Sequence, residues 1–207
     1  MIWSDKVLGV VTLAYLVLFL VHLVYFATGK ESVLRAMWPI LYAVFGLHTV
    51  GLAARWVESY RLGIGHAPLS NFYESLIFFA WCIALILILM KKRLRLPLIT
   101  MLATAAALLF MGYASLSPSV DRQIQPLIPA LQSNWLHVHV FTCFIAYASF
   151  AISFLAGLLY LLGLKSIPAG KLEDVNYQAV VVGFPMLTAG ILTGAVWAHY
   201  AWGTYWS

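Results

Sequence analysis

Six long apolar runs divide this chain, and they limit its possible folds more than any other feature of the sequence. The runs cover residues 7–28, 36–54, 76–90, 98–116, 135–164 and 180–200. A helix that crosses the hydrocarbon core of a bilayer takes about 20 mainly apolar residues. Of all residues 63% are hydrophobic and only 9% are charged. The sequence therefore predicts an all-α, polytopic transmembrane helical bundle of about six spans, with the lipid bilayer as its surroundings.

The basic residues predict how these spans are oriented. Cytoplasmic connections carry an excess of lysine and arginine. Eight of the twelve basic residues fall in alternate connections, at Lys30, Arg35, Lys91, Lys92, Arg93, Arg95, Lys165 and Lys171. Both chain ends, and the connections before the third and fifth spans, are therefore predicted on the outer face. This topology accounts for the net charge of +5, so no nucleic-acid partner is expected.

A single membrane domain over residues 1–207 is the simplest organisation. The sequence contains no internal repeat and no low-complexity linker. Asp5 and Lys6 leave the front of the first run without net positive charge, whereas a secretory signal begins with a positive region. We therefore expect the first run to be a retained span.

A polar, irregular stretch joins the second and third spans. Three charged residues are predicted to mark an exposed connection: Arg55, Glu58 and Arg61. The chain continues from Gly63 as GIGHAPLSNFYESL, in which Ser70 or Asn71 suits a helix N-cap and Glu74 completes a loose capping box. Two interpretations stay open: a well-capped entrance to the third span, or a loop that carries recognition chemistry.

Two histidines lie near the outer end of the fifth span, in the sequence WLHVHV. His137 and His139 are two positions apart, so on a helix they point in roughly opposite directions and cannot bind one metal together. One of them could be an axial ligand of haem, with a second ligand from elsewhere. The alternative is a pair of interfacial histidines with wet ring tips. His22, within the first span, is either a functional intramembrane group or an imidazole bonded to a backbone carbonyl.

Small residues within the spans favour helix packing. Gly190 and Gly194 are one turn apart, a spacing that permits close approach of a neighbouring helix. Cys82 and Cys143 fall inside predicted spans and are interpreted as small buried apolar residues. The chain contains no CxxCH motif, so it is not itself a c-type cytochrome.

The end of the sequence, from Trp197 to Ser207, is rich in aromatic residues. It contains three tryptophans and two tyrosines, grouped around Gly203. Such rings form interfacial belts in membrane proteins. Their number here, together with a glycine that lets a flat partner approach the backbone, also suits a planar apolar ligand such as haem.

Three ordered motifs resemble the CcsA/ResC family, which supplies the haem-handling membrane subunit of system II cytochrome c biogenesis. They are APLSNFYESL from Ala67, LQSNWLHVHV from Leu131 and GAVWAHYAWGTYW from Gly194. The last motif is similar to the front half of the tryptophan-rich WWD segment of cytochrome c assembly proteins. Together the motifs lie between about Arg55 and the end of the chain.

The resemblance implies roles for particular residues. It makes His139 an outer-face axial ligand of the iron of haem b, and it gives His137 no role. It places four residues in the haem-holding segment: Trp202, Gly203, Tyr205 and Trp206. It implies first a structural role for Asn71 and Glu74. Three arginines are predicted on the side where they could meet haem propionates: Arg55, Arg61 and Arg122.

The resemblance also implies partners and a place in the cell. Expected partners are a CcsB/ResB-type membrane subunit, an apocytochrome c that receives haem, and a thioredoxin-like thiol reductant. The chain would then be part of a haem-lyase complex in a bacterial plasma membrane or a thylakoid membrane, with haem on the periplasmic or lumenal side. No catalytic residue is assigned, and His48, His66 and His199 receive no role.

The chain departs from the family pattern after the aromatic segment. Family members continue with further spans and a second outer-face histidine, whereas this sequence stops at Ser207, so we expect the N-terminal portion of a CcsA-type domain. A HemX-like membrane regulator or scaffold of haem metabolism, without synthase activity, is the alternative function. A small-solute transporter is less favoured, because paired intramembrane charges and broken helices are not evident.

Overall fold

The computed structural model describes residues 3–92, 94, 96–164 and 167–205, and it is helical. Its helices are α1 (Trp3–Thr28), α2 (Glu31–Arg61), α3 (Phe72–Leu89), α4 (Pro97–Leu116), the short 3-10 helix η1 (Pro129–Leu131), α5 (Asn134–Leu161) and α6 (Ala169–Trp202). Six of them are long and apolar enough to cross a membrane. The prediction of an all-α transmembrane bundle is confirmed, and the protein is an integral membrane protein.

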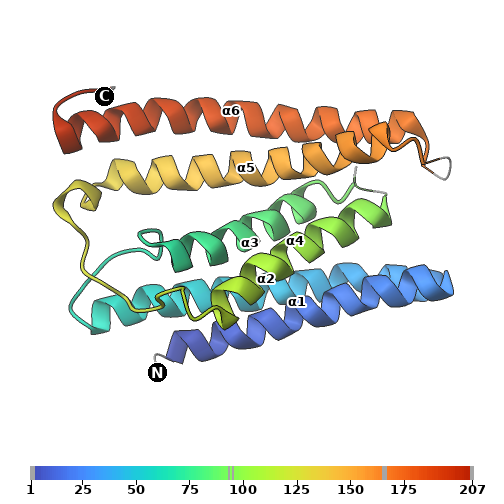
Figure 1. Ribbon diagram of the computed structural model, residues 1–207, viewed down its shortest axis with the longest axis horizontal. Coiled ribbons are helices and arrows are strands. Elements are labelled where there is room, and N and C mark those ends of the chain that lie inside the picture. Colours follow the sequence, from blue (N-terminus) through green and yellow to red (C-terminus); the bar gives the residue numbers. More distant parts are fainter. Residues whose placement is uncertain (1–2, 93, 95, 165–166, 206–207) are drawn as a thin grey trace.

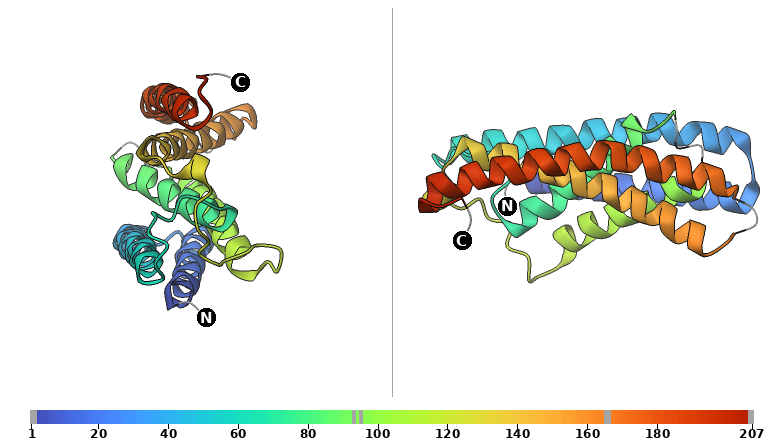
Figure 2. Two further views of the ribbon diagram at one scale, coloured as in Figure 1. Left: turned by 90° about the vertical axis from the view of Figure 1, so that its left-hand side faces the viewer. Right: turned by 90° about the horizontal axis from the view of Figure 1, so that it is seen from above.

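The six long helices lie roughly side by side in three layers (Figure 1). The hairpin of α5 and α6 forms one outer layer, α3 and α4 lie in the middle, and α1 and α2 form the other side, as the end-on view of Figure 2 also shows. Helix α5 contacts both middle helices, whereas the contacts of α6 are mainly with α5. Both described chain ends lie at the same end of the bundle, and the side of the membrane that this end faces stays a prediction.

Two helices are longer than their apolar runs indicate. Helix α2 continues to Arg61, so the prediction of an exposed connection at residues 55–61 is wrong: Arg55 and Glu58 are helical and buried. Helix α6 begins at Ala169, well before the apolar run at residue 180. Polar residues extend both helices because their backbone hydrogen bonds continue and, in α2, tertiary partners satisfy the charges.

Local sequence chemistry determines where α3 begins and where α6 ends. The side chain of Asn71 caps α3 by accepting a hydrogen bond from the backbone N–H of Glu74 at 2.8 Å. Gly203 ends α6 in the left-handed region with φ of 76°, a conformation that glycine adopts without a steric penalty. The N-cap expected at Ser70 or Asn71 is therefore present, at Asn71.

The small residues of α6 let α5 approach closely, as their spacing predicts. A Cβ added to Gly190 would lie 2.5 Å from Sγ of Cys143, and one added to Gly194 would lie 2.6 Å from Nδ1 of His139. Neither position has room for a larger side chain. The close contact brings the ring of His139 onto the backbone of α6.

Candidate functional site at one end of the bundle

His139 of α5 is oriented by the backbone of α6. Its Nδ1 lies 2.7 Å from the carbonyl oxygen of Gly190, and because a carbonyl only accepts, Nδ1 carries the proton and donates. The lone pair is then on Nε2, which makes no hydrogen bond within the described part of the chain. Nε2 of His139 is also accessible at its surface. Among the described residues, two side-chain N or O atoms are fully buried without a hydrogen-bond partner, Ser4 Oγ and His48 Nε2, and Nε2 of His139 is not one of them. Histidines that bind metals are commonly held this way by their second nitrogen.

Trp197 connects His139 to the aromatic end of α6. The rings of His139 and Trp197 are stacked, with centroids 6.0 Å apart and an interplanar angle of 15°. Trp202 meets Trp197 edge to face at 4.9 Å. Trp197 is itself fixed, because its Nε1–H donates to the carbonyl of Ala130 in η1 at 2.8 Å. The structure therefore brings both His139 and Trp202 against the indole ring of Trp197.

The remaining predicted residues of the aromatic segment are less closely joined to His139. Gly203 follows α6, and Tyr205 stacks on His199 with ring centroids 4.4 Å apart. Trp202 and Tyr205 are 56% and 52% exposed, so both present aromatic surface to their surroundings. Trp206 lies outside the described residues.

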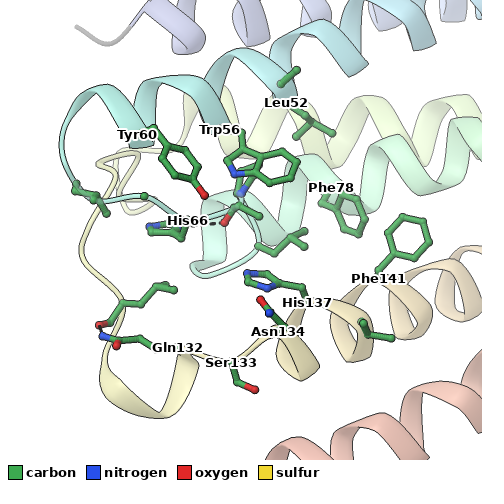
Figure 3. Close-up of a pocket in the computed structure, with 18 of the residues that line it drawn as sticks. Leu52, Trp56, Tyr60, His66, Phe78, Gln132, Ser133, Asn134, His137 and Phe141 are labelled. Carbon is green, nitrogen blue, oxygen red and sulfur yellow. Dashed lines mark hydrogen bonds between the residues drawn. The ribbon is translucent and has the colours of Figure 1, made fainter.

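His137 faces the other side of α5, as the two-residue spacing predicts. It lines a cavity of about 1120 Å³ between α2, α3, α5 and the two long connections (Figure 3). Most of the wall is apolar, with Trp56 and Tyr60 from α2 and Phe78 and Trp81 from α3. His139 does not line this cavity, so the two histidines lie in different surroundings.

The connection from Gly63 to Leu69 forms one wall of the cavity through His66. The backbone N–H of His66 donates to Ser59 Oγ at 3.0 Å, while Nδ1 and Nε2 lie 2.8 Å and 2.9 Å from the carbonyl oxygens of Ala67 and Gln125. The imidazole thus joins this connection to the segment that precedes α5. The irregular glycine-rich sequence was the signal for a recognition loop, and its backbone does lie against a cavity.

Arg55 lies at the centre of a buried ion network, which we define as Asp5, Arg55 and Glu74. Its Nε donates to Glu74 Oε1 at 2.9 Å and its Nη1 to Asp5 Oδ1 at 3.3 Å. Its Nη2 also donates to the carbonyl of Arg122 at 2.9 Å. Since Arg55 is 1% exposed, the interpretation that it meets haem propionates is wrong. Its charge is already matched inside the protein.

The carboxylates near Arg55 are used to join helix ends. Glu74 Oε2 accepts from both the backbone N–H and the hydroxyl of Ser70, at 2.9 and 2.8 Å. Glu58 accepts from the backbone N–H groups of Trp3 and Ser4 in the first turn of α1, which lack partners within that helix. The structural role expected of Asn71 and Glu74 agrees with these contacts.

The other histidines and arginines have simpler surroundings. His22 donates from Nδ1 to the carbonyl of Leu18 at 2.8 Å, which is the backbone-bonded alternative considered for it. His48 is buried, with Nδ1 3.2 Å from the hydroxyl of Tyr15. Arg122 donates to the carbonyl of Ser115, whereas Arg61 is exposed at the end of α2.

Sequence reasoning missed Trp197 as the residue between His139 and Trp202, and it missed the cavity. A signal for Trp197 existed, because it precedes Trp202 by five residues at the end of an apolar run. The cavity had no comparable signal. Its walls come from three helices and two connections, and only their packing creates the space.

Comparison with known proteins identifies relatives of the whole chain. A family model described as cytochrome c assembly protein matches residues 69–207. Proteins named cytochrome c biogenesis protein CcsA are similar to this chain in Chlamydomonas reinhardtii (41% identical, 75% of this chain and 46% of the relative) and Guillardia theta (36%, 77% and 61%). The CcsA protein of Parasynechococcus marenigrum strain WH8102 is 32% identical over 98% of this chain and 77% of its own.

These matches agree with the three motifs quoted from the sequence. The chain spans about half of the length of the Chlamydomonas relative and about three quarters of that of Parasynechococcus marenigrum. The match to the family model includes His139 and the aromatic segment at the end of α6. The chain therefore belongs to the cytochrome c assembly protein family, within the group that contains the CcsA proteins.

Proposed function

We propose that this protein takes part in cytochrome c maturation by holding haem b, as a substrate, at the outer end of α5 and α6. Family membership supports the role in maturation. The observation that carries the more specific proposal is the orientation of His139, whose Nδ1 proton is used by Gly190. This leaves Nε2 as the nitrogen that offers a lone pair to iron.

The residues around His139 suit the flat, mainly apolar face of haem. Trp197 supports the imidazole from one side, and Trp202 extends the aromatic surface beyond it. Trp202 and Tyr205 are half exposed, so they can contact a ring that stays accessible from outside. Gly203, without a side chain, leaves the backbone between them open. We include Trp206 in this surface from the sequence resemblance alone.

The chemistry assigned to the chain is positional. Bound haem supplies the vinyl groups that react with the thiols of an apocytochrome c, while His139 holds the iron and the aromatic residues hold the ring plane. Arg61 is the exposed arginine of the three considered for the propionates. A CcsB/ResB-type membrane subunit and a thioredoxin-like reductant are the partners we propose, in a bacterial plasma membrane or a thylakoid membrane with haem at the outer or lumenal face.

Absorption spectroscopy of the purified chain tests the ligand assignment. The chain is co-expressed with a CcsB-type partner, and its haem Soret band is compared with those of His139→Ala and His137→Ala. We expect His139→Ala to lose most of the band and His137→Ala to keep it, because the two rings face different sides of α5. Equal haem content in the two variants would contradict the assignment.

A second experiment tests the biological role. A strain deficient in the family member is complemented with the chain, and holocytochrome c is measured by haem staining. We expect restoration by the wild-type sequence, joined to the remaining segment of a CcsA relative, and not by its His139→Ala form. Unchanged holocytochrome c levels with both forms, beside normal haem synthesis, would favour the HemX-like alternative.

A further inference from the structure

The cavity beside His137 is separate from the surface around His139 and has its own chemistry. It extends from the connections at the end of the bundle down to Thr49, Trp81 and Phe141. Phe141 is seven residues beyond the first residue of α5, which corresponds to about 10 Å along a helix. The cavity therefore reaches about two helical turns into segments that are long and apolar enough to span the membrane.

Four polar side chains in the cavity wall are without internal partners. His137, Asn134, Trp56 and Tyr60 line the space, and none of their side chains forms a hydrogen bond to another described residue. Figure 3 shows His137 and Asn134 of α5 together, across from Trp56 and Tyr60 of α2. Imidazole, amide, indole and phenol groups offer both donors and acceptors to a ligand.

The wall carries no formal charge other than what its imidazoles can acquire. Among the described residues that line it there is no lysine, arginine, aspartate or glutamate. Both ring nitrogens of His66 already face the carbonyls of Ala67 and Gln125, so neither is available to a ligand. A ligand with two carboxylates, such as a porphyrin, would leave its charges unmatched here. The wall favours a neutral ligand.

The aromatic residues at the side of the cavity indicate the route of entry. Trp56 is 48% exposed and Phe141 is 43% exposed, and both belong to membrane-spanning segments. A ligand dissolved in the bilayer can therefore reach the cavity between α2 and α5 without crossing water. Phe78 and Trp81 are stacked with ring centroids 5.5 Å apart, and both contribute apolar surface deeper inside the cavity.

We propose that this cavity binds the neutral ring of a bilayer-soluble quinone, with His137 and Asn134 as hydrogen-bond partners of its oxygen atoms. A quinone ring is planar and uncharged, and its carbonyls accept hydrogen bonds while the reduced form also donates them. Its apolar tail would leave between α2 and α5 into the bilayer. The proposal does not depend on haem binding at His139.

A titration with decylubiquinone tests this proposal on the full chain in detergent, with quenching of tryptophan fluorescence as the signal. We expect saturable binding in the wild type. His137→Leu should raise Kd about tenfold, since loss of one good hydrogen bond has about that effect. His199→Leu removes an exposed histidine of α6 outside the cavity and should leave Kd within about twofold.

A second variant keeps the test independent of any effect of His137 on folding. Ala53 lines the cavity from α2 and is exposed to it, so Ala53→Phe fills space without entering the packed core. Ala43→Phe adds the same side chain at an exposed position on the same helix, away from the cavity. We expect only Ala53→Phe to abolish saturable quenching.

Two controls distinguish a quinone from other molecules that could occupy the cavity. Metal-free protoporphyrin, which is planar but carries two carboxylates, should not compete with decylubiquinone. Competition by protoporphyrin with an equal Kd, or equal quenching in Ala53→Phe and Ala43→Phe, would overturn the proposal. So would mass spectrometry of the purified chain that finds a phospholipid which decylubiquinone does not displace. Loss of the Soret band in His139→Ala bears on haem binding alone.

Discussion

Two regions at the same end of the bundle differ in whether their polar groups have partners inside the protein. In the buried ion network, Arg55 is 1% exposed and Glu74 is 0% exposed, and each has several internal partners. At the end of α5 and α6, His139 is only partly buried and keeps one ring nitrogen without an internal partner, while Trp202 is 56% exposed. The first region stabilises the fold. The second keeps a ring nitrogen and aromatic surface that are available to a ligand.

The difference shows that the buried charged residues and the candidate binding residues of this protein are different groups of side chains. A buried charge is tolerated only when other groups satisfy it, so the most strongly bonded residues are the least available to a substrate. Side chains that retain unmatched groups near the surface are better candidates for binding. Mutations that break the ion network should therefore affect stability first, whereas those at the end of α5 and α6 should affect ligand binding first.

Removal of Arg55 should have the largest effect on stability. Arg55→Leu leaves the buried carboxylate of Glu74 and the partly buried carboxylate of Asp5 without their cationic partner. We expect the free energy of unfolding to fall by about 3–5 kcal/mol. Circular dichroism during titration of detergent micelles with dodecyl sulfate measures it. Arg61→Leu, at an exposed position of the same helix, should change it by less than about 0.5 kcal/mol. Equal effects of the two variants would contradict the importance of the network.

A double variant sharpens this result. Arg55→Leu combined with Glu74→Leu removes both charges, so the uncompensated carboxylate of Glu74 is gone. We expect the double variant to be more stable than Arg55→Leu alone, because a buried pair costs less to replace than to split. If the two losses simply add, Arg55 and Glu74 are not coupled and the network is not a unit.

Separation of α5 from α6 should have an intermediate effect. Gly190→Leu places a side chain where even a Cβ would meet Sγ of Cys143 at 2.5 Å, and such overpacking costs about 1–3 kcal/mol. It should also lower haem content, because His139 loses the carbonyl that orients it. Gly157→Ala is the control, since a Cβ there meets nothing within 4 Å. Normal stability and haem content in Gly190→Leu would show that the close contact is dispensable.

The smallest effect is expected at Trp197. Trp197→Phe keeps an aromatic ring against His139 but removes the donor to the carbonyl of Ala130, a loss of about 1 kcal/mol in the free energy of unfolding. Trp135→Phe changes a partly exposed tryptophan whose side chain makes no hydrogen bond among the described residues, and it should leave stability unchanged. If both variants lose the same free energy, the bond to Ala130 contributes nothing.

The sequence predicted the fold class and much of the local structure at the site. Long apolar runs specify spans, and the N-cap at Asn71, the close packing at Gly190 and Gly194, and the divergence of His137 from His139 all follow from spacing along a helix. The assignment of His139 to haem stays a proposal. The errors concern charges: Arg55 looked like an exposed residue because it follows an apolar run, whereas partners 50 and 19 residues away bury it.

What the sequence determined by itself was local: the number of the spans, the N-cap at Asn71, and which residues share a helix face. These properties depend on interactions within a few turns of one helix. The tertiary structure alone decided which polar groups were satisfied and which were left over. It matched Arg55 with Glu74, turned Nδ1 of His139 towards Gly190, and opened a cavity beside His137. Such contacts depend on packing between segments far apart in the chain, and the pattern within any one segment does not contain them.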